Sequence, residues 1–235
     1  ASVLCFTDGN TIVPMISAQD HKRISDGDMG ANTGGMGAYA PAPVMTKELD
    51  KIVYDTILLP AVKAMKKEGC PFKGCLYAGL MITKDGPKVV EFNCRFGDPE
   101  TEAVLPLLES DLAKIMLACT KGTLKKEKVE WKNACAVDVV LASEGYPATH
   151  SSGEEISGLE EAKKTGCLVF HAGSVKKKGR YFVNGGRVLN VVAVAPTLKE
   201  ARDKAYEGVS KISWRGMQYR HDIADKGLKR LKKGK

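Results

Sequence analysis

The chain has 235 residues and carries 36 lysines and arginines against 28 aspartates and glutamates, a formal net charge of +8. Hydrophobic residues make up 43% and charged residues 27%, as in an ordinary globular protein. No apolar run approaches the roughly 18 residues of a membrane-spanning helix. The composition therefore excludes a membrane span, a fibre and a wholly disordered chain.

The positive charge is concentrated at one end. Six basic residues and no acid lie within 226–235, so the rest of the chain is close to neutral. The few aromatic residues do not interleave with the basic ones, as they do on many nucleic-acid-binding surfaces. The pattern predicts a solvated basic tail or linker at 226–235, with an interaction element as the alternative.

Cysteine and histidine show no pattern of a structural site. The seven cysteines are an odd number without any C-x-x-C pair, and the four histidines lack metal-ligand spacing. This argues against a disulfide framework and a zinc site. Scattered thiols are typical of a reducing compartment, so we expect a cytoplasmic protein.

The first predicted element is a hairpin over residues 2–16, turned by Asp8-Gly9-Asn10. The chain begins at Ala1 directly before this apolar run and without an initiator methionine. We therefore expect a fragment, a processed product or a chain that begins within a domain. A dense polar cluster at 19–23 follows, and then five glycines lie within residues 26–37.

A helix is predicted from the N-cap Thr46 to about residue 68, kinked or divided at Pro60 and ended by Gly69. A second hairpin is predicted over 74–83 and 88–93. Asp98 has the features of an N-cap with Pro99 at the first helical position. That helix and a successor are expected to reach Gly122.

Residues 123–133 are polar and lysine-rich, which suggests a domain boundary. We expect one domain over 1–124, a small domain over 125–225, and the basic segment 226–235. Further strands are predicted at 134–142, 168–171, 180–183 and 187–195. The last two are predicted to pair through a turn at Asn184-Gly185-Gly186, and a capping box at Thr197 and Glu200 opens a helix to about residue 211.

The segment 89–100 carries the strongest chemical pattern. On a strand, Glu91 and Asn93 point to the same face, with Cα atoms about 6.5–7 Å apart. Two oxygen ligands from one strand suit Mg²⁺, which takes its other ligands from water and phosphate. Arg95 follows as a planar cation suited to phosphate or carboxylate. The alternative is an exposed edge strand with solvated polar residues.

The glycine-rich segment 26–37 has two interpretations. Backbone N–H groups of such a loop can hold an anion. Its spacing matches neither the Walker A loop nor the dinucleotide fingerprint. The alternative is a mobile surface turn.

Several motifs together resemble glycinamide ribonucleotide synthetase (phosphoribosylamine–glycine ligase), a family of the ATP-grasp superfamily. The resemblance covers nearly all of residues 2–225 in the order of the family. The motifs lie at 18–23, 32–39, 76–81, 91–100, 145–147, 171–173, 185–189 and 219–223. The implied fold is α+β: the C-terminal subdomain of an ATP-grasp fold followed by a small mixed α/β domain.

The resemblance implies an ATP-dependent carbon–nitrogen ligase of purine biosynthesis. Such an enzyme joins glycine to phosphoribosylamine through a glycyl phosphate, with ATP as a substrate. Mg²⁺ or Mn²⁺ is then expected on Glu91 and Asn93, and Arg95 and Asp98 are the predicted catalytic residues; Asp98 either orients the amine or only caps its helix. The predicted substrate-binding residues are Asp20, Lys22, Arg23, Asn32, Thr33, Gly34, Gly35 and Gly37.

The resemblance also implies missing parts. It places the chain in the second grasp subdomain and the C-terminal domain, without the phosphate loop and ATP lysines of the N-terminal half. That half is thus an expected partner, and we expect little ligase activity from the chain alone. The strand at 76–81 lacks the acid that many ATP-grasp ligases carry there. The rival hypotheses are a non-catalytic nucleotide- or partner-binding remnant of the fold and a basic nucleic-acid-binding domain; we expect no nucleic acid and no membrane as partners.

Overall fold

The computed structural model describes residues 1–233, which form two compact units whose segments alternate along the sequence. The first unit contains Ala1–Gln19, Pro41–Gly97 and Leu107–Asn133. The second contains Asp20–Ala40, Asp98–Pro106 and Ala134–Lys235. The sequence domains expected at 1–124 and 125–225 stay a prediction, because these compact units are not continuous stretches of chain.

The first unit is built on a four-stranded antiparallel sheet in the order β2-β1-β7-β8. Its strands are β1 (Ser2–Thr7), β2 (Ile12–Pro14), β7 (Gly74–Thr83) and β8 (Gly86–Asn93). The Asp8 carboxylate accepts hydrogen bonds from the N–H groups of Asn10 and Thr11, which closes the first turn. Both predicted hairpins are confirmed.

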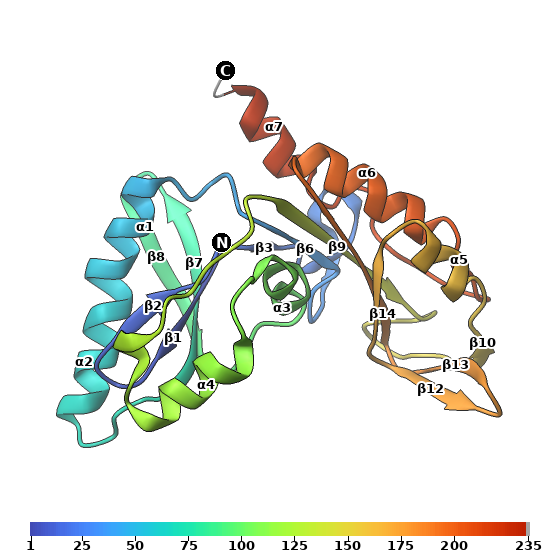
Figure 1. Cartoon of the computed structure of the whole chain (residues 1–235). Coiled ribbons are helices and arrows are strands. Elements are labelled where there is room, and N and C mark those ends of the chain that lie inside the picture. Colours follow the sequence, from blue (N-terminus) through green and yellow to red (C-terminus); the bar gives the residue numbers. More distant parts are fainter. Residues whose placement is uncertain (234–235) are drawn as a thin grey trace. The chain divides into compact units, whose positions relative to one another are not determined.

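One helical run covers a face of this sheet (Figure 1). It consists of α1 (Lys47–Val53), a π-helical turn (Tyr54–Leu58) and α2 (Leu59–Lys67). The predicted Thr46 cap is confirmed, since its hydroxyl accepts from the N–H of Leu49. Pro60 lies at the start of α2, directly after the π-helical turn, so the regular α-helix is interrupted next to this proline, which lacks the N–H for an intrahelical bond.

The core of the first unit lies between this helical run and the sheet. Its buried members are Val3, Cys5, Ile12, Val53, Leu58, Val62, Leu76, Ala78 and Leu80. A further helix, α4 (Leu112–Lys121), contacts β1 and β7 and ends at Gly122, whose φ of 72° is left-handed. Short 3-10 turns lie at Leu105–Leu107 and Leu124–Lys126.

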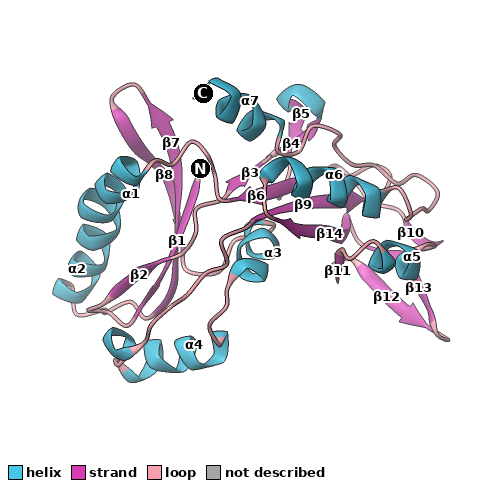
Figure 2. Cartoon of the chain, turned by 45° about the horizontal axis from the view of Figure 1, so that its top comes forward, coloured by secondary structure: helices cyan, strands magenta, loops and turns pink. Residues whose placement is uncertain are grey.

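The second unit contains a five-stranded sheet in the order β11-β14-β9-β6-β3. Its strands are β3 (Gln19–Asp20), β6 (Gly37–Ala40), β9 (Cys135–Ala142), β11 (Leu168–His171) and β14 (Arg187–Ala195). The helix α6 (Leu198–Val209) packs on β9 and β14, while α3 (Glu100–Val104) contacts β6 and β9 (Figure 2). The predicted capping box of Thr197 and Glu200 is confirmed at the start of α6.

A separate three-stranded sheet has the order β10-β13-β12. It consists of β10 (Ser152–Glu155), β12 (Ser174–Lys177) and β13 (Arg180–Asn184), and α5 (Leu159–Lys164) lies between β10 and β11 in the chain. The predicted pairing of β13 with β14 is therefore wrong. The backbones of Gly173 and Gly185 approach so closely that a Cβ on Gly173 would lie 2.8 Å from the Cα of Gly185, and the chain passes there from one sheet to the other.

The remaining elements of the second unit come from distant parts of the chain. A small hairpin is formed by β4 (Arg23–Ser25), a 3-10 turn (Asp26–Asp28) and β5 (Met29–Asn32). The basic segment expected as a solvated tail forms the helix α7 (Asp225–Lys233), and Leu228 packs against the core. Residues 234–235 lie outside the described part.

All seven cysteines are free thiols. Burial raises the pKa of Cys5 and of Cys75 to about 12, so both stay protonated at neutral pH. Within residues 1–233, no helix has the length and apolar character needed to cross a membrane.

Candidate functional site

The strand β8 sets the two predicted metal ligands on one face of the first unit's sheet. Glu91 lies opposite Gly79 and Asn93 opposite Tyr77, while the intervening Phe92 lies opposite Ala78. Because successive side chains alternate, Glu91 and Asn93 share a face that Phe92 does not. Glu91 is exposed and Asn93 is half-buried.

The donor set of this face fits a hard divalent cation. A carboxylate and an amide oxygen are ligands that Mg²⁺ prefers. A Cβ on Gly79 would lie 3.2 Å from the Cγ of Glu91, so the glycine leaves room for this side chain. Within the described residues, no group of three or more His, Cys, Asp or Glu is arranged to hold a metal. An ion on Glu91 and Asn93 would thus take its remaining ligands from water and substrate oxygens.

Arg95 follows the end of β8 on the same unit. Its side chain is exposed, and Nη1 donates to the carbonyl oxygen of Phe96 at 2.8 Å. The Phe96 ring in turn packs edge-on against Phe6, with centroids 6.3 Å apart. The guanidinium is therefore attached to a residue that is anchored by an aromatic contact, beside the strand that carries Glu91 and Asn93.

Asp98 does not cap a helix, contrary to the sequence prediction. The helix α3 begins at Glu100 with Pro99 as its N-cap, and no side-chain cap bond is present. The Asp98 carboxylate instead pairs with Nη1 of Arg187 at 2.9 Å. The charge of Arg187 competes successfully with the helix N–H groups for this carboxylate, and the peptide between Asp98 and Pro99 is cis.

The same guanidinium lies against the glycine-rich loop of the second unit. Nη1 of Arg187 donates to the carbonyl oxygens of Gly34 at 3.0 Å, Gly35 at 3.4 Å and Asp98 at 3.2 Å. The other side of the loop is equally close-packed, since a Cβ on Gly35 would lie 2.3 Å from Cδ of Pro99 and 2.8 Å from Oδ1 of Asp20. The structure thus brings Asp20, Gly34, Gly35 and Asp98 together.

The N–H groups of this loop are already used within the second unit. Those of Thr33 and Met36 donate to the carbonyls of Lys22 and His21. The N–H of Gly34 donates to the Tyr146 hydroxyl at 2.9 Å, and the N–H of Gly35 to the Thr33 hydroxyl at 2.9 Å. The interpretation of these four N–H groups as an anion cradle is therefore wrong. Substrate binding by these residues stays a prediction, but it must use other groups.

Buried acids surround the loop. Burial and the neighbouring Glu100 raise the pKa of Asp20 to about 7, although Lys22 at 3.2 Å opposes the shift. Asp138 on β9 is fully buried, and neither of its carboxylate oxygens has a hydrogen-bond partner among the described residues. Burial and the carboxylates of Glu102 and Asp98 raise its pKa well above the usual range. Burial therefore favours the protonated form of Asp138.

Lys22 and Arg23 are the accessible cations of the predicted acceptor side. The Lys22 side chain is 56% exposed, whereas its neighbour His21 is buried, and burial lowers the pKa of His21 to about 4. Arg23 donates to the carbonyl of Gly30 at 2.6 Å across the β4–β5 hairpin, and Asn32 lies opposite it in the ladder. Gly37 is buried on β6, where a Cβ would lie 2.5 Å from the carbonyl oxygen of Asp138.

The β4–β5 hairpin is held by a buried arginine. The side chain of Arg220 is fully buried and contacts both oxygens of Asp222 at 2.8 Å, Oδ1 of Asp28 at 3.1 Å and the carbonyl of Arg23 at 3.0 Å. Although burial opposes it, this pairing holds the pKa of Asp222 well below its usual range. Lys226 also contacts Asp28.

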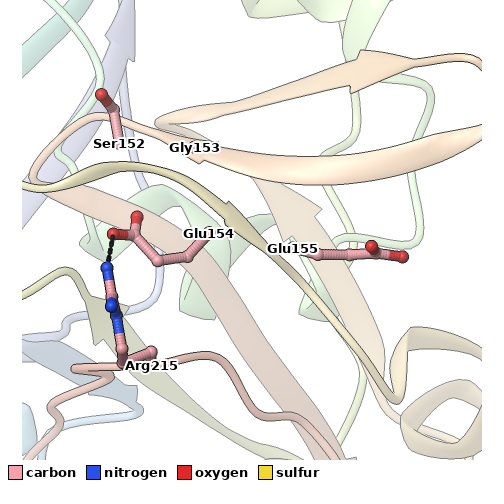
Figure 3. Close-up of a pocket in the computed structure, with 5 residues that line it drawn as sticks. All are labelled: Ser152, Gly153, Glu154, Glu155 and Arg215. Atoms are coloured by element: carbon pink, nitrogen blue, oxygen red, sulfur yellow. Dashed lines mark ion pairs between the residues drawn. The ribbon is translucent and has the colours of Figure 1, made fainter.

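Two hollows lie elsewhere on the second unit. One, of about 430 Å³, is lined by Ser152, Gly153, Glu154, Glu155 and Arg215, and contains none of the predicted residues. Figure 3 shows the side chains of Glu154 and Arg215 pointing toward each other, while Glu155 points away. Nη2 of Arg215 lies 3.7 Å from Oε1 of Glu154. The other, of about 500 Å³, is lined by Thr101, Glu102, Leu105 and Pro106 and by the β11 residues Leu168, Phe170 and His171.

Sequence reasoning missed Arg187, Tyr146 and Asp138. Arg187 lies in one of the family-like motifs at 185–189, but nothing in that motif indicates contact with a loop about 150 positions earlier. Tyr146 similarly lies in a motif at 145–147. Asp138 is one acid within an apolar strand, and this was the only signal that could have indicated a buried functional acid.

Two family models match the chain. Residues 1–101 match the ATP-grasp (A) domain of phosphoribosylglycinamide synthetase, and residues 136–226 match the C domain of phosphoribosylglycinamide synthetase. The phosphoribosylamine–glycine ligase of Arabidopsis thaliana, described as chloroplastic, is 50% identical over 97% of the chain and 44% of its own length. The phosphoribosylamine–glycine ligase of Caldanaerobacter subterraneus is 50% identical over 95% of the chain and 53% of its own length. The chain thus spans about half the length of these relatives.

A solved structure of another protein has a similar fold. The crystal structure of phosphoribosylamine–glycine ligase from Thermotoga maritima superposes with a TM-score of 0.84 at 38% identity, over 94% of the chain and 54% of the other protein. The biotin carboxylase domain of a thermophilic 2-oxoglutarate carboxylase superposes with a TM-score of 0.63 at 16% identity. This second likeness shows the α+β fold alone.

Proposed function

Because the chain belongs to the phosphoribosylglycinamide synthetase family, we propose that it supplies the metal-binding and acceptor-side part of a phosphoribosylamine–glycine ligase. ATP, glycine and phosphoribosylamine would give glycinamide ribonucleotide, ADP and phosphate through a glycyl phosphate. The observation that carries the proposal is the β7–β8 register, which sets the exposed Glu91 and the half-buried Asn93 on one face of the edge strand β8.

On the first unit, the Glu91 carboxylate and the Asn93 amide oxygen would hold Mg²⁺ or Mn²⁺. The bound ion would neutralise triphosphate charge and orient the γ-phosphoryl group. Arg95, exposed beside this strand, is the cation for the transferring phosphoryl group or for the glycine carboxylate.

On the second unit, the acceptor binds beside the glycine-rich loop. Lys22 and Arg23 are exposed and provide positive charge for the substrate phosphate. The Asp98 carboxylate, whose orientation is fixed by Arg187, accepts a hydrogen bond from the attacking amine. The buried acid Asp20 and residues Asn32, Thr33, Gly34, Gly35 and Gly37 form the wall of this acceptor site.

The chain contains only part of the residues that such a reaction needs. It spans 44–53% of the two ligases described above. We propose that the remaining half grips ATP, that the chain alone forms little ADP, and that the enzyme works in the cytoplasm. Efficient glycine-dependent ADP formation by residues 1–235 alone would contradict the second of these statements.

The test is Glu91→Gln in the whole protein expressed from its gene, with Glu68→Gln as the control, because Glu68 is an exposed glutamate of the same unit. We expect kcat to fall about 10²-fold and the half-saturating Mg²⁺ concentration to rise about tenfold. Unchanged Mg²⁺ dependence contradicts the metal assignment. An unmodified protein that binds ATP but forms no ADP with glycine and phosphoribosylamine contradicts the ligase function and supports the remnant hypothesis.

A further inference from the structure

One arginine of the second unit connects two groups of predicted site residues that are distant in the sequence. Arg187 begins β14, and its side chain is 21% exposed. Through Nη1 it contacts the Asp98 carboxylate and three backbone carbonyls, those of Asp98, Gly34 and Gly35. The predicted catalytic Asp98 and the predicted substrate loop therefore share one cation.

These contacts determine the direction in which the loop's polar groups point. The Gly34 and Gly35 carbonyls are turned toward the guanidinium, and the N–H groups of Thr33 to Met36 donate to protein acceptors. Gly34 is exposed but Gly35 is buried, so the Gly35 carbonyl in particular needs a donor, since a buried carbonyl without a partner is unfavourable. Arg187 supplies that donor.

The guanidinium of Arg187 fits the glycine-rich loop sterically as well as electrostatically. A Cβ on Gly34 would lie 3.0 Å from both Cζ and Nη2 of Arg187 and 3.2 Å from Nε, so the planar guanidinium lies directly on the Gly34 backbone. Lysine has no planar group to make this contact. Directly before β14, a Cβ on Gly186 would lie 2.4 Å from the ring of Tyr146, whose hydroxyl accepts from the N–H of Gly34. The loop is thus fixed by Arg187 and Tyr146 together.

The acidic side chains near Arg187 also favour a role of this cation in holding Asp98 and the loop. Asp138, Glu102 and Asp20 lie near enough for their charges to influence one another, and Arg187 is the cation that lowers the pKa of both Asp138 and Glu102 against the effect of burial. Among the described residues, Arg187 is the ion-pair partner found for the Asp98 carboxylate. Without Arg187, no ion pair would fix the orientation of this carboxylate.

On the basis of the function proposed above, we propose that Arg187 is a positioning residue of the ligase. Its guanidinium holds the Asp98 carboxylate and the Gly34–Gly35 carbonyls in one geometry, so that the phosphoribosylamine site is formed before the substrate binds. Arg187 acts through Asp98 and the loop rather than on ATP. Its loss must therefore affect the acceptor substrate selectively.

The experiment compares Arg187→Ala and Arg187→Lys in the whole protein expressed from its gene. The control is Arg180→Ala, because Arg180 is an exposed arginine of the same unit that pairs with Glu155 at 2.8 Å. For Arg187→Ala we expect kcat/KM for phosphoribosylamine to fall about 10²-fold, with KM for ATP within twofold of the unmodified enzyme. Arg187→Lys, which keeps the charge but not the planar contact, is expected to lose about tenfold. Added methylguanidinium is expected to restore part of the activity of Arg187→Ala only.

Three results would overturn the proposal. They are an unchanged kcat/KM for phosphoribosylamine, equal losses for ATP and phosphoribosylamine together with a lowered melting temperature, and a failure of methylguanidinium to rescue. If Arg187→Ala does not fold, Arg187→Lys takes its place in the test. A loss of kcat/KM for phosphoribosylamine that exceeds the loss for ATP then supports the proposal, and equal losses overturn it.

A second measurement separates this proposal from the proposed function. Hydrogen–deuterium exchange at residues 33–36 measures how well the hydrogen-bonded N–H groups of the loop are protected. We expect faster exchange in Arg187→Ala but not in Arg180→Ala. If the unmodified protein lacks ligase activity, the proposed function fails, and the exchange rates still show whether Arg187 fixes the loop. Unchanged exchange in Arg187→Ala overturns the positioning role whatever the activity.

Discussion

The two units carry their predicted site residues in opposite ways. On the first unit, Glu91 lies exposed on the edge strand β8, and Arg95 lies exposed just after its end. Few protein contacts fix these two side chains. On the second unit, Asp20 and Asp138 are buried, and Asp98 is held by Arg187. The difference fits our proposal, in which the first site is completed by ligands from solution and the second is shaped by contacts within the fold. Substitutions should therefore damage stability in the second unit and chemistry alone in the first.

The largest expected effect on stability is that of Gly35→Ala. Gly35 has a φ of 122°, and a Cβ there would lie 2.3 Å from Cδ of Pro99, so backbone strain and overlap act together. We expect the free energy of unfolding of the second unit to fall by about 5 kcal/mol. Urea denaturation followed by Trp214 fluorescence in a Trp131→Phe background reports this unit, since the chain has two tryptophans.

The matched control for this substitution is Gly86→Ala in the first unit. Gly86 also has a left-handed φ, 94°, but nothing lies within 4 Å of an added Cβ. We expect a loss of about 1 kcal/mol, read through Trp131 in a Trp214→Phe background. Equal losses for both glycines would show that the close packing around Gly35 has no energetic role.

The next effect concerns the pH dependence of the second unit. The pKa of Asp20 is raised to about 7 in the folded state from 3.8, so between these values the folded state binds the proton that the unfolded state has released. The contribution of Asp20 to stability must therefore fall as pH rises from 4 to 7. Asp20→Asn, which resembles the protonated acid, should remove a decline on the order of 4 kcal/mol. The decline is measured by urea denaturation at pH 4, 5.5 and 7.

The exposed Asp85 of the first unit provides the control for this measurement. Asp85→Asn should leave the pH profile of the second unit as it is in the unmodified chain. The burial of an ionisable Asp20 would be refuted by an Asp20→Asn variant that loses stability with pH as steeply as the unmodified chain.

The smallest expected effect is that of Glu91→Gln on stability. The side chain is exposed and forms no ion pair among those found in residues 1–233. We expect the free energy of unfolding of the first unit to change by less than about 0.5 kcal/mol. A larger loss in the same urea titration would mean that Glu91 supports the fold, and the contrast between the two units would then be weaker.

Local chemistry explains the elements that were correctly predicted. The Asp8-Gly9-Asn10 turn, the Thr46 cap and the capping box of Thr197 and Glu200 depend on groups within a few residues of one another. The β7–β8 hairpin has the same origin, and it is sufficient to set Glu91 and Asn93 on one face. The placement of Glu91 and Asn93 on one face was therefore readable from a single stretch of sequence.

The second site depends on contacts between distant residues, and there the local signals were misleading. Asp98 before Pro99 has the pattern of a helix cap, but Arg187, 89 positions later, takes its carboxylate. The glycine-rich loop has the pattern of an anion cradle, but its N–H groups bond to Lys22, His21, Tyr146 and Thr33. Asn184-Gly185-Gly186 has the pattern of a hairpin turn, but the close approach of Gly173 separates two sheets there. No local pattern reports such partners.

The interleaving of the two units has a consequence for the order in which the chain is made. The hairpin β4–β5 is synthesised well before Arg220 and Asp222, which fix it and follow about 195 positions later. At typical rates of about 5–20 residues per second, the hairpin waits roughly 10–40 seconds for them. The glycine-rich loop is likewise synthesised before its partners Tyr146 and Arg187. The first unit is complete by Asn133, so during synthesis it can fold while the acceptor side is still without its partners.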